Sequence, residues 1–175
     1  MASKKHYILT SLTLGIIAAS SALLIGASNM LTKNKIAENE QNKINSGIAA
    51  IFGDSAKILK ENTIENDDYK YVNYFYHIGS EDKEVGTIYR TTGSNMYGKV
   101  SLLIGFNLDN QFLSLSIITN EQTYASTLKD NYIDLLNKGE RDLDDVSCGA
   151  TYGAKLVRDM IKESSQADLD KVWDK

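Results

Sequence analysis

An uncharged run of 25 residues, Tyr7 to Leu31, limits what this chain can fold into more than any other feature of its sequence. As an α-helix the run is about 37 Å long, and the hydrocarbon core of a bilayer is roughly 30 Å thick. A cleaved signal peptide also has a charged start and an apolar stretch. This run, however, is long for that role and has no clear small-residue cleavage site. We therefore expect residues 1–31 to be a transmembrane anchor.

The lysines that flank this run do not decide its orientation. Lys4 and Lys5 precede it, and Lys33, Lys35 and Lys43 follow it, so the positive-inside rule has no bias to act on. The charge of the remaining chain is clearer, because it carries 17 basic against 23 acidic residues, a net charge of −6. An acidic domain without a basic stripe is not expected to bind nucleic acid.

The cysteine content excludes two common ways of holding a small domain together. Cys148 is the only cysteine, so the chain can form no internal disulfide, and no CxxC or zinc motif is present. We therefore expect no metal site, and the fold must depend on the burial of apolar side chains. The length of 175 residues suits one folded domain of ordinary size with appendages.

Apolar residues recur with helical spacing directly after the anchor, where Ile44, Ile48 and Ile51 share one face. We expect the anchor to continue as a stalk helix over residues 32–53. The polar stretch that follows, up to Asp68, is typical of a loop or a short linker.

Four later runs rich in tyrosine, valine and isoleucine predict β-strands. They cover residues 69–78, 84–91, 99–107 and 111–119. Residues 108–110, Leu-Asp-Asn, form a turn sequence between the last two runs and predict an antiparallel hairpin.

Two amphipathic helices are predicted after the strands. The first ends near Gly139, and its apolar residues are Leu128, Ile133, Leu135 and Leu136. The second begins near Ala150, and its apolar face contains Ala154, Val157 and Ile161. Strands followed by helices, without strict alternation, favour the α+β class over a doubly wound sheet.

The sequence DDVSCGATYGAK, residues 144–155, places a threonine at the start of this last helix. Thr151 would lie in the first turn, where backbone N–H groups lack intrahelical partners and the helix dipole is positive, which suits a phosphate. Gly149 removes a side chain where a ligand would approach, Ala150 adds little bulk, and the threonine hydroxyl can be esterified. The alternative is structural, with Ser147 or Thr151 acting only as a helix cap.

The segment Asp145-x-x-Cys148-Gly149-Ala150-Thr151 resembles a known flavinylation motif, Asp-x-x-(Ser/Thr)-Gly-Ala-Thr. That motif belongs to the FMN-binding domain of the G subunit of the Rnf electron-transport complex and of the C subunit of the sodium-translocating NADH:quinone reductase. The resemblance also includes the anchor that leads into residues 32–39, the Tyr97-Gly98-Lys99-Val100 start of the hairpin, and the Asp-Asn turn. It covers nearly the whole chain and is weakest over residues 54–80.

The resemblance implies an FMN-binding domain over residues 54–175, with a half-barrel-like antiparallel sheet packed against helices. It implies that a separate flavin transferase joins FMN through its phosphate to Thr151, on a domain that faces away from the cytoplasm. Gly149 and Ala150 would allow close approach of the flavin, and Asp145 would be part of what the transferase recognises. Two segments depart from the family pattern around this site, in addition to Cys148, which replaces a serine or threonine. They are Tyr152-Gly153-Ala154, which lacks a further hydroxyl residue, and Glu121-Gln122-Thr123-Tyr124, which replaces Glu-Thr-Pro-Gly.

Tyrosines near the matched segments offer stacking surfaces for the flavin ring. The candidates are Tyr97, Tyr124 and Tyr152, with Met96 as a weaker one, and each also suits an ordinary core or surface position. Lys155 and Arg158 in the following helix could screen a phosphate, or they could belong to a solvated helix face.

The function that the resemblance implies is that of a membrane-anchored electron carrier with covalent FMN. It would be a G-type subunit of a Rnf-like ion-translocating complex that works with integral membrane subunits and performs no substrate chemistry of its own. One alternative is a free-standing extracytoplasmic flavoprotein that passes electrons to other acceptors. Another is a membrane-tethered assembly module without flavin.

A hydrolase that uses Cys148 as its nucleophile is disfavoured. A nucleophile normally requires a positioned base, and His77, the only histidine beyond the anchor, lies in a run that predicts a strand.

Overall fold

The structure is a computed structural model that describes residues 4–64, 68–81 and 83–170. The chain divides into two compact units, residues 1–42 and 43–175, and each is described by itself. The first three residues of the expected cytoplasmic N-terminus and residues 65–67 of the expected linker lie outside the described residues.

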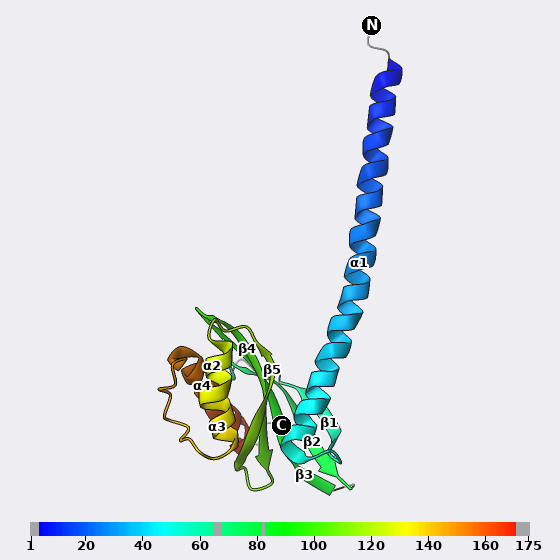
Figure 1. Cartoon of the computed structure of the whole chain (residues 1–175). Helices are drawn as coiled ribbons and strands as arrows, with labels where there is room; N and C mark the ends of the chain where they lie inside the picture. The colour runs from blue at the N-terminus through cyan, green and yellow to red at the C-terminus, as the bar shows by residue number, and fades with distance from the viewer. Residues whose placement is uncertain (1–3, 65–67, 82, 171–175) are drawn as a thin grey trace. The chain divides into compact units, whose positions relative to one another are not determined.

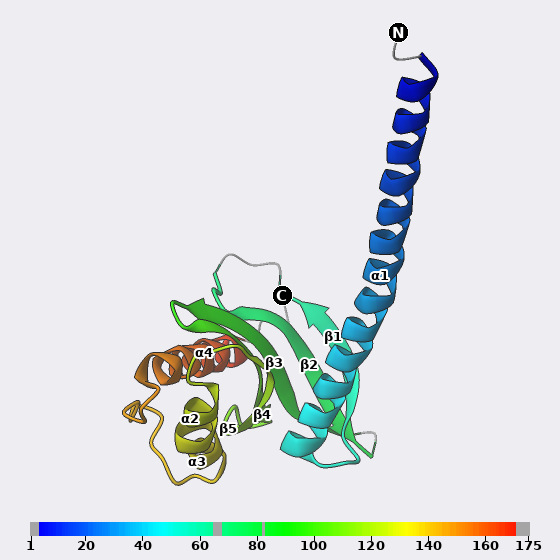
Figure 2. The same ribbon diagram turned by 45° about the horizontal axis from the view of Figure 1, so that its top comes forward.

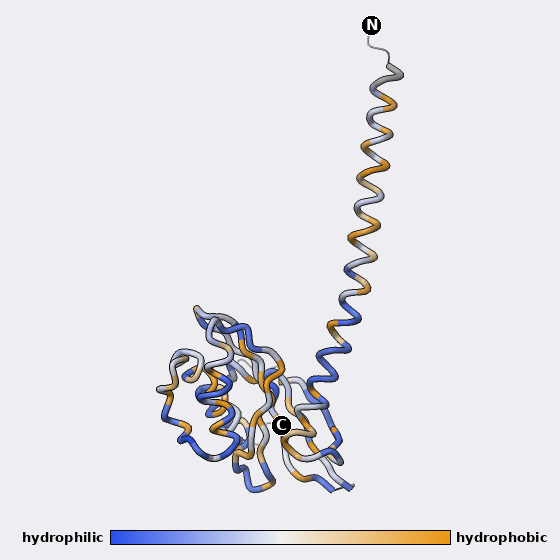
Figure 3. The backbone as a smooth tube through the Cα atoms, viewed as in Figure 1, coloured by the Kyte–Doolittle hydropathy of each residue, from blue (hydrophilic) through white to orange (hydrophobic). Residues whose placement is uncertain are grey.

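The first unit consists of the N-terminal part of helix α1 (Lys4–Phe52). Its apolar side chains are exposed, among them Leu23 and Leu24, which are more than 70% accessible. Among the described residues, α1 is the one helix that is long and apolar enough to cross a membrane. Figure 3 shows the apolar stretch, followed by a hydrophilic one.

Hydroxyl groups in this apolar helix bond to the helix itself. Thr13 donates to the Leu9 carbonyl and Ser20 to the Ile16 carbonyl, both at 2.8 Å. This back-bonding satisfies polar groups that would otherwise require water, so serines and threonines do not exclude a membrane environment.

The second unit contains a five-stranded antiparallel sheet whose strands lie side by side in chain order. The strands are β1 (Lys57–Thr63), β2 (Val72–Ser80), β3 (Lys83–Asn95), β4 (Gly98–Asn107) and β5 (Phe112–Asn120). Four of them correspond to the predicted runs, and β4 and β5 form the predicted hairpin.

The prediction of a loop or linker up to Asp68 is wrong for residues 57–63, which form β1. This strand pairs only with β2, and most of its side chains are exposed. An edge strand of this kind does not need the apolar alternation on which a strand prediction depends, and charged side chains discourage pairing with other chains.

Helical segments cover both faces of the sheet (Figures 1 and 2). The last turns of α1 bury Ile44 and Ile48 against one face, in a cluster with Tyr76, Ile78, Ile88, Leu103 and Ile118. The other face carries α2 (Ala125–Leu128), α3 (Asp134–Asn137) and α4 (Thr151–Leu169), and a π-helical turn, Lys129–Ile133, joins α2 to α3. The α+β class and both C-terminal helical regions are therefore confirmed.

A buried carboxyl group joins α4 to the sheet. Asp168 Oδ1 accepts hydrogen bonds from Thr87 Oγ1 at 2.7 Å and from the Tyr89 hydroxyl at 3.1 Å. Asp168 Oδ2 is buried and has no hydrogen-bond partner among the described residues. Burial raises the pKa of Asp168, and the two hydroxyl donors only partly oppose this effect.

Replacement of Asp168 by asparagine should change how stability depends on pH. Because folding raises the pKa of Asp168, its stabilising contribution is present at low pH and is lost as pH rises through the folded-state value. The melting temperature of the wild type relative to Asp168→Asn should therefore fall as pH rises above about 4, the ordinary pKa of an aspartate. Thermal unfolding of both full-length proteins in detergent measures this. A difference that does not vary with pH would show that Asp168 titrates as an ordinary carboxyl group.

Candidate functional site

Helix α4 begins without a side-chain cap. Ala150 occupies the N-cap position, with φ −124° and ψ 45°, and no side-chain capping hydrogen bond is made within the described residues. The Thr151 hydroxyl has no hydrogen-bond partner among the described residues. The alternative in which Ser147 or Thr151 serves only as a cap is therefore not supported, and the hydroxyl is available for other chemistry.

The first backbone N–H groups of α4 are also available. The first bond within the helix runs from Ala154 N to the Ala150 carbonyl at 3.0 Å. The N–H groups of Thr151, Tyr152 and Gly153 precede it and have no acceptor in the described part of the chain. Together with the positive end of the helix dipole, three free donors favour an anion at this position.

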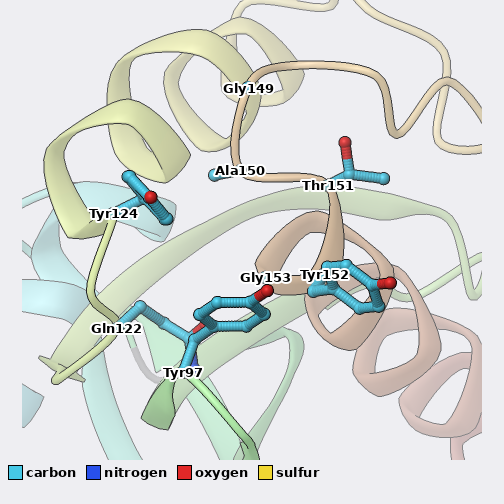
Figure 4. Close-up of a pocket in the computed structure, with 8 residues that line it drawn as sticks. All are labelled: Tyr97, Gln122, Tyr124, Gly149, Ala150, Thr151, Tyr152 and Gly153. Atoms are coloured by element: carbon cyan, nitrogen blue, oxygen red, sulfur yellow. The ribbon is translucent and has the colours of Figure 1, made fainter.

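A cavity of about 250 Å³ lies beside this helix start (Figure 4). Three segments that are distant in the sequence form it. They are the tip of the β3–β4 hairpin, the segment after β5, and the start of α4. The lining residues are Tyr97, Gln122, Tyr124 and residues 149–153. In Figure 4 the Thr151 side chain points away from the Tyr97 ring.

The tyrosines of this cavity already contact one another. The Tyr97 ring centroid lies 5.4 Å from that of Tyr152 and 6.3 Å from that of Tyr124. A flat ring inserted between two others requires roughly 7 Å, or two van der Waals contacts, so nothing can stack between Tyr97 and Tyr152 as they stand. Tyr152 and Tyr124 are 60% and 54% exposed, and their open faces remain available for stacking.

The hairpin tip is held by the segment that follows β5. Thr123 N donates to the Tyr97 carbonyl at 2.9 Å, and Glu121 N donates to the Lys99 carbonyl at 2.8 Å. Gly98 lies between these contacts with φ +133°, and a Cβ there would overlap the Glu121 carbonyl. Only glycine meets both requirements, and the contacts fix Tyr97 at the cavity.

Gln122 and Gly153 depend on each other. Gln122 is buried, and its Nε2 donates to Asn95 Oδ1 at 3.0 Å and to the Gly98 carbonyl. A Cβ at Gly153 would lie 3.0 Å from Leu128 Cδ2 and 3.3 Å from Gln122 Oε1. Both residues belong to segments that depart from the family pattern described above, and both line the cavity.

Gly149 and Cys148 have local structural roles. Gly149 has φ +82°, a left-handed conformation that disfavours other residues. Cys148 is only 8% exposed and belongs to the hydrophobic core beneath the loop. Because its side chain packs in the core, this cysteine is not placed as a nucleophile.

The charged candidates differ in how they are engaged. Asp145 Oδ2 accepts hydrogen bonds from Arg141, a residue that the sequence reasoning missed. Arg158 is paired with Asp159 at 2.8 Å. Lys155 is exposed and has no ion-pair partner within the described residues. Met96 is 83% exposed and does not line the cavity.

Among the described residues, no group of three or more histidine, cysteine, aspartate or glutamate side chains is arranged to hold a metal ion.

The fold and this site define a class of protein, an α+β domain preceded by an apolar helix, with a candidate cofactor pocket at a helix N-terminus. Residues 1–51 match the family model described as the RnfG N-terminal region. The match supports an RnfG-like N-terminal region in this chain. It ends before β1 and does not include the domain that carries the cavity. A comparison with curated proteins found no match.

The close contact at Gly153 predicts that a β-branched residue there will be destabilising. Gly153→Val should lower the free energy of unfolding by about 1–3 kcal/mol, because Leu128 and Gln122 must move. Lys155→Val places the same side chain at an exposed position of the same helix and should cost less than about 1 kcal/mol. Chemical denaturation of the two variants measures the difference. Equal effects would show that the helix start has room that the structure does not indicate.

Proposed function

We propose that this chain is a G-type electron-carrying subunit of a Rnf-like ion-translocating complex, with FMN attached covalently through a phosphoester to Thr151. The observation that carries the proposal is the position of the Asp-x-x-Cys-Gly-Ala-Thr segment. It ends at the start of α4, where the threonine hydroxyl caps nothing and three N–H donors are free beside a tyrosine-lined cavity.

The residues at this site fit a flavin phosphate. Three N–H donors in the first turn of a helix suit an anion, and Gly149 presents bare backbone beside them. Lys155 lies one turn after Thr151 and is not paired with an acid among the described residues, so it adds a positive charge on the same helix. Exposed faces of Tyr124 and Tyr152 offer stacking surfaces at the other side of the cavity.

Attachment requires a donor in which the phosphate of FMN is activated as a phosphoric anhydride, as in a flavin dinucleotide. Thr151 Oγ1 attacks the phosphorus, its proton passes to a base of the transferase, and a new P–O bond forms. The anhydride P–O bond breaks, and the nucleoside monophosphate leaves with the electron pair. No oxidation or reduction accompanies this transfer.

The resulting phosphodiester keeps one negative charge. The N-terminus of α4 stabilises such a charge by roughly 0.3–1 kcal/mol. That is too little to hold a cofactor alone. A covalent bond removes the dependence on free FMN, whereas even a nanomolar site, worth about −12 kcal/mol, would empty by dilution outside the cytoplasm.

Bound FMN would supply the redox chemistry of the subunit. The chain's own residues would orient the flavin ring through the tyrosines, fix its phosphate at the helix start, and cover part of its surface. None of these roles requires a general acid or base, which agrees with a carrier that performs no substrate chemistry.

We further propose the arrangement of the chain in the membrane. Residues 1–31 would form a single-pass anchor with a short cytoplasmic N-terminus, residues 32–53 a stalk helix, and residues 54–175 the extracytoplasmic FMN-binding domain. The partners would be the integral membrane subunits of the complex and, during maturation, a flavin transferase.

Loss of the Thr151 hydroxyl should abolish flavin attachment without unfolding the domain. The full chain is expressed with a flavin transferase, and covalent flavin is read as fluorescence on a denaturing gel and as added intact mass. Thr151→Ala should carry no label, because the attacking oxygen is absent. Ser147→Ala removes a neighbouring hydroxyl from the same loop and should keep the label. Label on Thr151→Ala, or an unmodified wild type, would refute the proposal.

Cys148→Ser should remain labelled. Cys148 helps to orient the loop through its backbone carbonyl, which accepts a hydrogen bond from Asn131 Nδ2 at 3.2 Å. The substitution leaves this carbonyl unchanged. The added polar group in the core should lower the free energy of unfolding by about 1–3 kcal/mol. Labelling and thermal unfolding are measured on the same preparation. Loss of label in a folded Cys148→Ser protein would assign the thiol a role in attachment.

A further inference from the structure

The segment between α3 and α4, residues 138–150, leads into Thr151 at the start of α4. It has no regular helix or strand, and connections of this length in compact domains are uncommon unless they have a function. A loop of this kind needs partners for its carbonyl groups, because helix and sheet do not supply them. The side chains that donate to these carbonyl groups are those of Asn131, Tyr132 and Arg141.

Arg141 makes the largest set of these contacts. Its Nε and Nη2 donate to Asp145 Oδ2 at 3.2 and 3.1 Å, and Nη2 also donates to the Ser147 carbonyl at 2.5 Å. Its Nη1 donates to the Asn131 carbonyl. The side chain is only 12% exposed, and the guanidinium carbon lies 5.5 Å from the centre of the Tyr132 ring.

Asp145 completes this arrangement from within the loop. While its Oδ2 binds Arg141, its Oδ1 accepts a hydrogen bond from Ser147 N at 3.2 Å. Both carboxylate oxygens are therefore used inside the segment, even though the side chain is about half exposed. We call Arg141, Asp145 and Ser147 the loop clamp.

The π-helical turn supports the loop clamp with two further bonds. Asn131 Nδ2 donates to the Cys148 carbonyl at 3.2 Å, and the Tyr132 hydroxyl donates to the Leu143 carbonyl at 2.7 Å. Burial raises the pKa of Tyr132 to about 12, so its hydroxyl remains a donor at physiological pH. Three carbonyl groups of the segment thus have side-chain partners from Asn131, Tyr132 and Arg141.

Arg141 contributes most to the loop clamp because its side chain is charged and mostly buried. Exposed ion pairs contribute little, but a guanidinium that is mostly buried and bonded to three groups loses all of them on truncation. Lysine cannot replace it, because an ammonium group lacks the planar fork that reaches a carboxylate and two carbonyl groups together.

We propose that Arg141 is a positioning residue for flavin attachment, and that the flavin transferase recognises the loop shape that the loop clamp holds. Asp145 then acts through Arg141 and not by separate contact with the transferase. This inference rests on the proposed attachment of FMN to Thr151. It states that the transferase recognises the conformation of the loop and not the side chain of Asp145 alone.

The test is a double-mutant cycle on transferase kinetics with the full chain as acceptor and a flavin dinucleotide as donor. Arg141→Lys and Asp145→Asn should each lower kcat/KM by roughly tenfold or more, because each loses charge-assisted hydrogen bonds. The loss should appear as a higher KM for the chain, since fewer molecules present the competent loop, while kcat stays near the wild-type value. The double variant should be no worse than either single variant.

Asp144→Asn is the matched control. It makes the same change of charge one residue earlier and breaks only the exposed pair with Lys162, whose Nζ lies 2.6 Å from Asp144 Oδ1. Its kinetics should equal those of the wild type. In the unlabelled chain, amide hydrogen exchange of Ser147 should be faster in Arg141→Lys and Asp145→Asn and unchanged in Asp144→Asn.

The outcomes separate the two proposals. Wild-type chain without label at Thr151 would refute the proposed function and, with it, this inference. A labelled wild type with multiplicative losses in the double variant would show that Asp145 contacts the transferase independently, which overturns the inference alone. Wild-type kinetics in Arg141→Lys, or a loss in Asp144→Asn equal to that in Asp145→Asn, would also overturn it. A lowered kcat with unchanged KM would show that the transferase binds the variant chain as well as the wild type, which would overturn the role of the loop shape in recognition.

Discussion

Burial of α4 against β3 determines where the Thr151 hydroxyl lies. Near its N-terminal half, α4 approaches the strand closely, and a Cβ at Gly93 would lie 2.8 Å from Leu156 Cδ1. Near its C-terminal end, Asp168 bonds to Thr87 and Tyr89 of the same strand. The residues between them, including Ala154, Val157, Met160 and Ile161, are buried in the core. A helix attached at both ends cannot slide or rotate without exposing these side chains, so its first turn stays in place.

A fixed helix start is useful only if the chain leading into it is fixed as well. The hydrophobic core holds this loop in place indirectly, through polar groups on buried side chains. Tyr132 is fully buried beneath the loop and yet directs its hydroxyl to the Leu143 carbonyl, and its ring supports the Arg141 guanidinium. Because the π-helical turn is packed in the core, the polar contacts of Tyr132 hold the loop in a fixed position. Side chains that are part of the core thus determine the conformation of a surface segment, which is how a loop residue acquires a defined position.

The sequence predicts the parts of this protein that depend on local pattern. Strand runs rich in β-branched and aromatic residues indicate β2 to β5, because these strands are half or fully buried and their composition reflects it. It does not predict β1, whose polar side chains reflect its place at the edge of the sheet. The motif residues Gly149 to Thr151 are identified as candidates from their resemblance to a known motif. Gln122 and Asn131 are not, because their contacts with Gly153 and the Cys148 carbonyl exist only after the fold brings separate segments together.

The size of the cavity gives the proposed covalent bond a physical reason. About 250 Å³ is below the range of roughly 300–1,000 Å³ in which small-molecule sites bury most of their ligand. The contact between Tyr97 and Tyr152 also prevents a ring from entering between them, which leaves only open tyrosine faces. A site of this size covers part of a flavin and would hold it weakly by non-covalent contact. Weak non-covalent binding and an exposed ring would not suit a storage or catalytic site. For a carrier, an exposed ring would allow donor and acceptor to approach in turn, and the proposed ester at Thr151 would retain the flavin without enclosing it.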